Sequence, residues 1–381
     1  MSPERLQKTH EALDREVASG RYSGYITMVT RNGKIADWHA SGWQNVEEKI
    51  PMTKDSIIKI YSMTKVITSV AVLTLVEEGK VQLTDPVEKY FPVMKDLKVY
   101  TGGTADAPTL EPAKRPITVA DLLTHTAGYY YDASWSADPI PGQLLSRAKI
   151  WEATSMDDFM ARIATVPLHQ QPGTRFRYGI HTDMLGAIVE KASGVPFAQF
   201  LQQRIFGPLG MRDTSFTVPT EKLARKAVVY GYGNGKLTPM PDLLPERGIP
   251  SGGGGLYSTA ADYVRFAQML LNGGELDGAR IVSRKTVELM ATDRIAHLAD
   301  PHPFGQQDMG FGLGVRMMTN QGATRHLGSK GMFGWDGAAT TLAWMDPKEK
   351  MVSILLTQHM PFNEGDIFAT FVNGTYSALV D

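Results

Sequence analysis

The chain has 381 residues, of which 43% are apolar and 21% charged. This composition is ordinary for a globular protein and excludes a disordered or fibrous chain. Lysine and arginine total 39 against 40 for aspartate and glutamate, so no overall field attracts nucleic acid or an anionic membrane. The absence of cysteine excludes disulfides, thiolate catalysis and cysteine metal sites.

The first 20 residues are charged throughout and contain no apolar stretch of the kind that a signal peptide needs. They predict an amphipathic helix with Leu6, Leu13 and Val17 on one side. The most apolar stretch, residues 66–76, is shorter than the roughly 20 residues that cross a bilayer. We therefore expect a soluble, cytoplasmic protein with no membrane partner.

Both ends of the chain contain strand-like segments. Residues 26–30 and 34–40 flank Arg31-Asn32-Gly33, which predicts a hairpin. Residues 340–345 and 351–357 flank a second turn and precede a helix-like segment at 367–379. The simplest arrangement is one antiparallel sheet built from both chain ends and flanked by the terminal helices.

The middle of the chain is mostly helical in pattern. It predicts an α+β fold with two domains: residues 1–80 and 216–381 with the sheet, residues 81–215 mainly helical, and the active site between them. Helices are expected at 119–123, 156–164, 184–192, 197–206 and 260–271, and irregular segments at 101–116, 129–142, 236–255 and 299–310.

The pattern Ser-x-x-Lys occurs three times, beginning at Ser56, Ser62 and Ser146. The segment around Ser56 alternates like a strand, which would place its serine and lysine on opposite faces. Ser146 lies in a polar, solvated region. Ser62 instead opens a segment that is apolar nearly all round and ends at Gly79, as in a helix buried in the fold.

On such a helix Lys65 reaches the Ser62 hydroxyl, because residues three apart share a face. Free backbone N–H groups at the helix N-terminus would stabilise anionic oxygens near Ser62. Burial lowers the pKa of a lysine, and a pKa lowered by about 3 leaves a neutral amine near pH 7. The spacing alone favours the plainer interpretation, in which Ser62 is an ordinary helix cap and Lys65 a solvated first-turn residue.

Four motifs in order carry a family resemblance: SMTK from Ser62, LLTHTAG from Leu122, PGTRFRYG from Pro172 and the glycine-started helix motif from Gly252. This series resembles the serine β-lactamase-like superfamily, which includes class C β-lactamases, DD-peptidases and family VIII carboxylesterases. The similarity covers nearly the whole chain, and the segment from Phe333 to Pro347 is most like the esterase branch.

The resemblance implies that Ser62 is the nucleophile, that Lys65 assists it and that Tyr178 is the third catalytic residue. The rival Tyr232-Gly233-Asn234 matches the Y-x-N form of β-lactamases but lies in a glycine-rich turn outside the PGTRF context. Ile180 stands where that form has Asn and cannot hydrogen-bond as Asn does. This departure argues against efficient β-lactam turnover.

The family's strand element implies an oxyanion hole formed by the backbone N–H groups of Ser62 and Ala338. Trp335-Asp336-Gly337 resembles the typical W-G-G of family VIII, with Asp in the middle; these three residues and Tyr129 are the expected substrate-binding residues. Asp336 is either part of the site or a solvated strand residue, and His326-Leu327-Gly328 is a weaker candidate for the same element. A backbone donor to an oxyanion contributes roughly 3 kcal/mol.

The remaining candidates receive no catalytic role. His125 is expected to hold its loop, and His181 and Asp183 lack metal-ligand spacing, so we predict no metal and no cofactor. Aromatic residues that either line the cleft or serve as packing are Tyr129, Tyr130, Tyr131, Trp135 and Trp151. The chain has no G-x-S-x-G pentapeptide, which excludes the nucleophile elbow of the α/β-hydrolases.

These features predict a serine carboxylesterase that acts on a small-molecule ester with a short acyl chain through a Ser62 acyl-enzyme. Proton transfer would involve Lys65 and Tyr178; whether a neutral Lys65 or an anionic Tyr178 is the resting base is open. The alternatives are a β-lactamase or D-amino-acid peptidase, an acyltransferase to an alcohol, and a non-catalytic scaffold that self-assembles. The sequence does not predict the oligomeric state.

Overall fold

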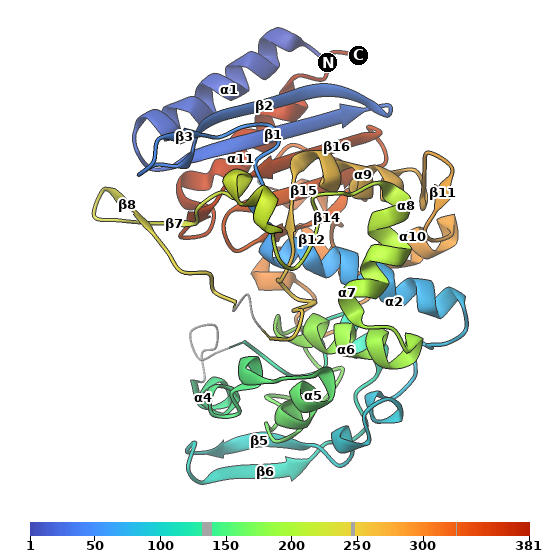
Figure 1. Ribbon diagram of the computed structural model, residues 1–381. Coiled ribbons are helices and arrows are strands. Elements are labelled where there is room, and N and C mark those ends of the chain that lie inside the picture. Colours follow the sequence, from blue (N-terminus) through green and yellow to red (C-terminus); the bar gives the residue numbers. More distant parts are fainter. Residues whose placement is uncertain (132–138, 245–247, 325) are drawn as a thin grey trace.

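The structure is a computed structural model that describes residues 1–131, 139–244, 248–324 and 326–381. In these residues the largest element is an eight-stranded antiparallel sheet (Figure 1), with order β12-β13-β14-β15-β16-β1-β2-β3. Strands from both chain ends meet where β1 pairs with β16, which confirms the predicted sheet. Its strands are β1 (Gly24–Arg31), β2 (Lys34–Asn45), β3 (Ile50–Pro51), β12 (Met309–Phe311), β13 (Arg316–Met318), β14 (Phe333–Gly337), β15 (Thr341–Asp346) and β16 (Met351–Leu356).

Both predicted hairpins are confirmed. Arg31 pairs with Lys34, so Asn32 and Gly33 form a two-residue loop, and both have positive φ, +52° and +73°. Positive φ at both positions matches the right-handed twist of the flanking strands, which is why Asn-Gly occurs there. At the second turn, the Asp346 carboxylate accepts hydrogen bonds from the backbone N–H groups of Lys348 and Glu349.

The terminal helices α1 (Pro3–Ala18) and α11 (Ile367–Ser377) pack against one another and cover the outer face of the sheet (Figure 1). The Ser2 hydroxyl caps α1 by accepting a hydrogen bond from the Arg5 N–H. Leu13 of α1 and Phe371 of α11 belong to the same buried cluster as strand residues such as Trp344. The apolar stripes of both helices are thereby removed from water.

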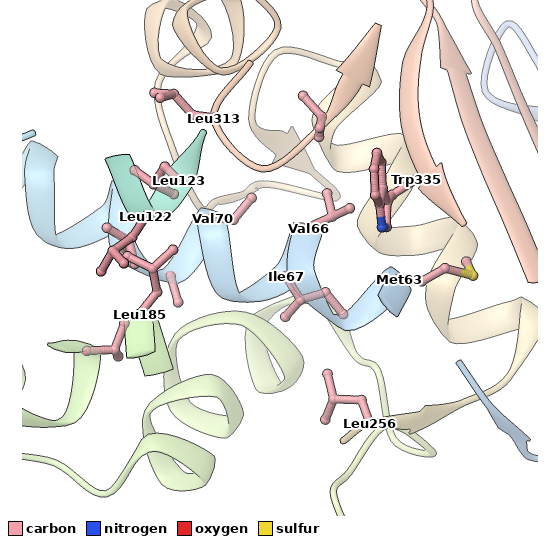
Figure 2. Close-up of a cluster of buried hydrophobic side chains, with 14 of the residues drawn as sticks. Met63, Val66, Ile67, Val70, Leu122, Leu123, Leu185, Leu256, Leu313 and Trp335 are labelled. Carbon is pink, nitrogen blue, oxygen red and sulfur yellow. The ribbon is translucent and has the colours of Figure 1, made fainter. Parts of the chain in front are cut away.

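Helix α2 (Thr64–Glu77) lies between the sheet and the helical part of the molecule (Figure 1). Residues 64–75 of this helix are all buried. Val66 and Ile67 point to different sides of it (Figure 2), and both join the main hydrophobic cluster. The predicted helix buried on all sides is therefore confirmed.

The expected helices of the middle segment are present, with bounds that agree closely with the pattern. They are α3 (Val119–Leu123), α5 (Met156–Ala164), α6 (His181–Ser193) and α7 (Phe197–Leu201), which a π-helical turn (Gln202–Phe206) extends. Two further helices, α4 (Pro139–Arg147) and α8 (Gly207–Leu209), were not expected. Helices α9 (Ala260–Leu271) and α10 (Arg284–Met290) follow, and α9 packs on β1, β15 and β16.

Several stretches that we expected to be irregular contain regular structure. Residues 101–116 include most of a hairpin, β5 (Lys98–Gly103) with β6 (Pro108–Pro112), which polar and turn-forming residues had concealed. Helix α4 begins within 129–142 and β8 within 236–255, and parts of both stretches lie outside the described residues. The other short strands are β4 (Ile58–Lys59), β7 (Tyr230–Gly233), β8 (Lys236–Pro239), β9 (Tyr257–Ser258), β10 (Glu275–Leu276), β11 (Ala279–Arg280) and β17 (His359–Met360).

The predicted division into two domains remains a prediction. One cluster of buried side chains contains Val66, Leu122, Leu185 and Trp335, which come from both proposed parts. No helix in the described part of the chain has the length and apolar character needed to cross a bilayer.

Because α2 is enclosed, shortening one of its side chains leaves a cavity. Ile67 is 0% exposed, whereas Ile35 on β2 is 58% exposed. We expect Ile67→Ala to lower the free energy of unfolding by about 2–4 kcal/mol, and Ile35→Ala, the matched control, to change it by about 0.5 kcal/mol or less. Guanidinium unfolding midpoints measure both. Equal effects would contradict the packing described for α2.

Candidate active site

Ser62 lies in a 3₁₀ turn, Tyr61–Met63, that leads into α2. We expected Ser62 to open the helix itself, but α2 begins at Thr64 and its N-cap position is Met63, with no side-chain cap. Ser62 is therefore not a helix cap, and its hydroxyl is free for other partners. Although Ser62 lies in this turn and not in the helix, the three-residue spacing still brings the two side chains together, with Lys65 Nζ 3.2 Å from Ser62 Oγ.

The two other Ser-x-x-Lys matches are structural. The Ser56 hydroxyl donates to the Gln44 side chain at 2.7 Å, and Lys59 pairs with Asp242 at 3.1 Å. Ser146 lies on the exposed side of α4. Of the three matches, the one at Ser62 brings the serine hydroxyl within hydrogen-bonding distance of the lysine of the same motif.

Lys65 is buried, with 1% of the residue exposed. Its Nζ donates to the carbonyl of Gly253 at 2.6 Å and lies 2.7 Å from the hydroxyl oxygen of Tyr131. Burial lowers the pKa of Lys65 to about 7, against the opposing charges of Asp183 and Asp336. An amine with this pKa is partly neutral near pH 7, whereas an ordinary lysine is fully protonated there.

A neutral amine has two N–H donors and one lone pair. The Gly253 carbonyl can only accept, so it takes one N–H. The Tyr131 hydroxyl can take the other, which leaves the lone pair for the hydrogen of the Ser62 hydroxyl. In this arrangement Lys65 is poised to accept the serine proton.

Tyr178 lies just before α6, at the end of the PGTRFRYG segment. The indole Nε1–H of Trp335 donates to its hydroxyl at 3.2 Å, and Lys65 Nζ lies 4.7 Å from the centre of its ring. Burial raises the pKa of Tyr178 well above its ordinary value, while a side-chain hydrogen bond with Ser62 opposes the shift. The phenol is therefore protonated, and the rival Tyr232 lies elsewhere, in β7 beside His359.

Strand β14 brings the Trp335-Asp336-Gly337 segment to this site. A Cβ on Gly337 would lie 2.4 Å from the carbonyl oxygen of Ile60, so the strand passes directly against the chain two residues before Ser62. Ala338 follows as the next residue, half-buried. The alternative element, residues 326–328, lies by α11, where the Leu327 N–H donates to the Asn373 side chain.

Asp336 is not a solvated strand residue. Its side chain is 13% exposed and lies 2.8 Å from the Arg316 guanidinium. Burial raises the pKa of this carboxyl, and Arg316 opposes that effect. The guanidinium also lies over the rings of Trp335 and Trp344, at 5.2 and 4.9 Å.

Tyr129, one of our expected substrate-binding residues, lies in the core. It is 2% exposed and its hydroxyl donates to the Ile163 carbonyl at 3.4 Å. Tyr131 instead reaches Lys65. Trp151 packs on Phe159 at 5.9 Å, and Trp135 lies outside the described residues. Three adjacent tyrosines carry no sequence signal that would separate Tyr131 from its neighbours.

Sequence reasoning also missed the support behind Lys65. The Asp183 carboxylate accepts hydrogen bonds from the Ser251 hydroxyl at 2.5 Å and from the Gly253 N–H at 2.9 Å. This holds the glycine-rich segment so that the Gly253 carbonyl faces the amine. The run of four glycines was the available signal, because a Cβ on Gly253 would lie 2.4 Å from the Asp183 side chain.

His125 and His181 form a buried pair beside Tyr178. Their Nδ1 atoms are 2.8 Å apart, and the Tyr129 N–H donates to His181 Nε2 at 3.3 Å. Burial lowers the pKa of both rings, that of His181 to about 3. The neutral pair joins the loop that carries Tyr131 to the start of α6. Among the described residues, no three His, Asp or Glu side chains gather as a metal site would require.

Comparison with known proteins identifies the family of this chain. The family model described as Beta-lactamase matches residues 10–372. The chain belongs to the beta-lactamase family. The matches also fit the wider serine β-lactamase-like superfamily, which includes esterases. The protein is an enzyme of the serine hydrolase type.

Two relatives illustrate the membership, and one solved structure illustrates the fold. Protein Rv1367c from Mycobacterium tuberculosis is 35% identical over 366 residues, which cover 92% of this chain and 90% of its own length. The lovastatin esterase of Penicillium rubens is 30% identical over 389 residues and 93% of each chain. The solved structure of EstCE1 superposes with a TM-score of 0.84 at 24% identity, over 98% of this chain and 99% of its own. The α+β fold is that of the beta-lactamase family.

The close fit of Gly253 against Asp183 predicts a cost for any side chain there. We expect Gly253→Ala to lower the free energy of unfolding by about 1–3 kcal/mol, since the new Cβ overpacks the site. The control is Gly233→Ala, because no atom lies within 4 Å of a Cβ at that position. Calorimetric unfolding of both variants measures the difference, and an unchanged Gly253→Ala variant would contradict the described contact.

Proposed function

We propose that this protein is a serine carboxylesterase that hydrolyses small, short-chain acyl esters, with Ser62 as nucleophile, Lys65 as base and Tyr178 as acid. The observation that carries the proposal is the placement of a buried amine, with a pKa of about 7, at 3.2 Å from the Ser62 hydroxyl oxygen. A base whose pKa lies near the working pH is the most effective for proton transfer.

In the acylation step, Ser62 Oγ forms a bond to the ester carbonyl carbon while its proton passes to Lys65 Nζ. The carbonyl oxygen becomes an oxyanion, which the backbone N–H groups of Ser62 and Ala338 would stabilise. The bond to the alcohol oxygen then breaks, and that oxygen takes the Tyr178 proton as the alcohol leaves. The proton on Lys65 passes to the phenolate and restores both groups.

Deacylation repeats these steps with water. Water attacks the acyl-enzyme carbonyl and gives up a proton to Lys65, and Ser62 Oγ leaves and regains its proton. The Trp335 N–H supports the assignment of Tyr178 as acid. Because the indole donates to the phenol oxygen, the phenol O–H is directed to another acceptor.

An ester substrate is favoured over a β-lactam by Ile180. This residue is 0% exposed and precedes α6, so it offers no side-chain hydrogen bond where the Y-x-N form has an amide. The esterase relative described above, the lovastatin esterase, is consistent with this choice. Transfer of the acyl group to an alcohol is the second candidate, because EstCE1 is described as a hydrolase with promiscuous acyltransferase activity.

The nucleophile is tested with a serine-reactive fluorophosphonate and localisation of the adduct by mass spectrometry. We expect one adduct, on Ser62, and at least a thousandfold lower kcat/KM for p-nitrophenyl butyrate in Ser62→Ala. The matched controls are Ser56→Ala and Ser146→Ala, the serines of the other two motif matches, which should keep both the adduct and the rate. An adduct at another serine would overturn the assignment.

Substrate class is tested on the same protein with short acyl esters, a cephalosporin and a D-Ala-D-Ala peptide. Hydrolysis of the esters alone supports the proposal. Cleavage of the peptide alone would overturn it in favour of a peptidase, and a higher yield of transfer product than of acid when an alcohol is added would favour the acyltransferase.

The pKa of Lys65 sets the pH dependence. Below about pH 7 the amine is protonated and cannot accept the Ser62 proton, so we expect kcat/KM to rise with pH through an apparent pKa of about 7. The pKa of Tyr178 is raised, so no loss of the acid should follow up to about pH 9. The measurement is the pH profile for p-nitrophenyl acetate, and a rate that falls between pH 7 and 9 would contradict these roles.

A further inference from the structure

One ring near Tyr178 differs from the others in its exposure. The rings of Trp335 and Phe304 lie 5.4 and 5.5 Å from that of Tyr178, and Phe304 also lies 5.7 Å from Phe176. Trp335 is 2% exposed and Phe176 7%, but Phe304 is 53% exposed. A large apolar ring is therefore left half in water directly beside the acid and its tryptophan partner.

The backbone holds this ring in place. Phe304 lies in the short turn Pro303–Gly305 with φ +54° and ψ +27°. This left-handed conformation is unfavourable for a bulky residue, and such strain persists where the surroundings fix it. The turn is closed by backbone hydrogen bonds from Gly305 to His302, at 3.1 Å, and from Gln306 to Pro303, at 3.0 Å.

The turn is also tied to the strand that carries Trp335. Arg316 donates to the Gln306 side chain at 3.4 Å and to Asp336 at 2.8 Å, and its guanidinium covers the Trp335 ring. Asp336, which stands where the esterase motif has glycine, thus connects the Phe304 turn to the site. These contacts hold the segment that carries Phe304 next to β14.

We propose that Phe304 is a specificity-determining residue whose ring forms the outer wall of the alcohol side of the site. The inference rests on the proposed function, because Tyr178 as proton donor to the leaving oxygen identifies the alcohol side. An aromatic or bulky apolar alcohol group would cover the exposed part of the ring. Both apolar surfaces would then be removed from water. The favoured substrate class is esters of aromatic or bulky apolar alcohols.

The test compares phenyl acetate with ethyl acetate, which share an acyl group and differ in the alcohol. For Phe304→Ala we expect kcat/KM for phenyl acetate to fall roughly three- to tenfold, mainly through KM, as loss of one aromatic contact predicts. The rate for ethyl acetate should change less than twofold. Phe304→Trp, which keeps an aromatic ring, should keep the preference.

Two further variants separate ring contact from other effects. Phe304→Asn also removes the ring but suits a positive φ, so it should lose the preference as Phe304→Ala does. Phe362→Ala is the matched control, because Phe362 is 49% exposed and packs on Phe368 instead of the site aromatics. It should leave both rates unchanged.

The outcomes are distinguishable. If the wild-type protein hydrolyses both esters and Phe304→Ala changes them equally or not at all, the inference is wrong and the proposed function stands. If the wild-type protein hydrolyses neither ester, the proposed function fails, and this inference fails with it.

Discussion

The function that we propose depends on the removal of water from around one amine. Lys65 is buried within α2, and its pKa falls from an ordinary 10.5 to about 7. A tenfold change in the protonation equilibrium corresponds to about 1.4 kcal/mol, so the site forgoes about 5 kcal/mol of charge stabilisation. The packing of a helix that is enclosed on all sides offsets this unfavourable free energy. The result is an amine nitrogen with a lone pair at 3.2 Å from the Ser62 hydroxyl oxygen.

The groups around the amine preserve this state. Its direct partners are a hydroxyl and a carbonyl, which hydrogen-bond without carrying charge. The two nearby carboxyls have partners of their own: Asp183 Oδ1 accepts hydrogen bonds from Ser251 and Gly253, and Asp336 pairs with Arg316. A free carboxylate against Lys65 would favour the ammonium form and raise its pKa. Both acids do raise the pKa of Lys65, but burial, which lowers it, is the larger effect.

Features that depend on short segments of the chain could be predicted from the sequence. Asn32-Gly33 required a two-residue turn, the all-apolar segment after Ser62 required an enclosed helix, and the three-residue spacing placed Lys65 near Ser62. Tyr131 and the contact between Asp183 and Gly253 could not be predicted, because they join segments far apart in the chain. The 3₁₀ turn at Ser62 was missed since its spacing mimics the first turn of a helix. Tyr129 was predicted in place of Tyr131 because the sequence does not indicate which of these nearby tyrosines the fold directs towards Lys65.

One physical cause accounts for the two proton-transfer roles that we propose. Burial disfavours charge, so it lowers the pKa of an amine and raises that of a phenol. Lys65 and Tyr178 share the same dry site, and both are driven to their neutral forms. A neutral amine can accept a proton and a neutral phenol can donate one, so a base and an acid coexist at the same pH. A resting ammonium–phenolate pair would reverse these roles, and it would need two charges in a place from which water is excluded. The uncharged pair is the arrangement that this burial favours.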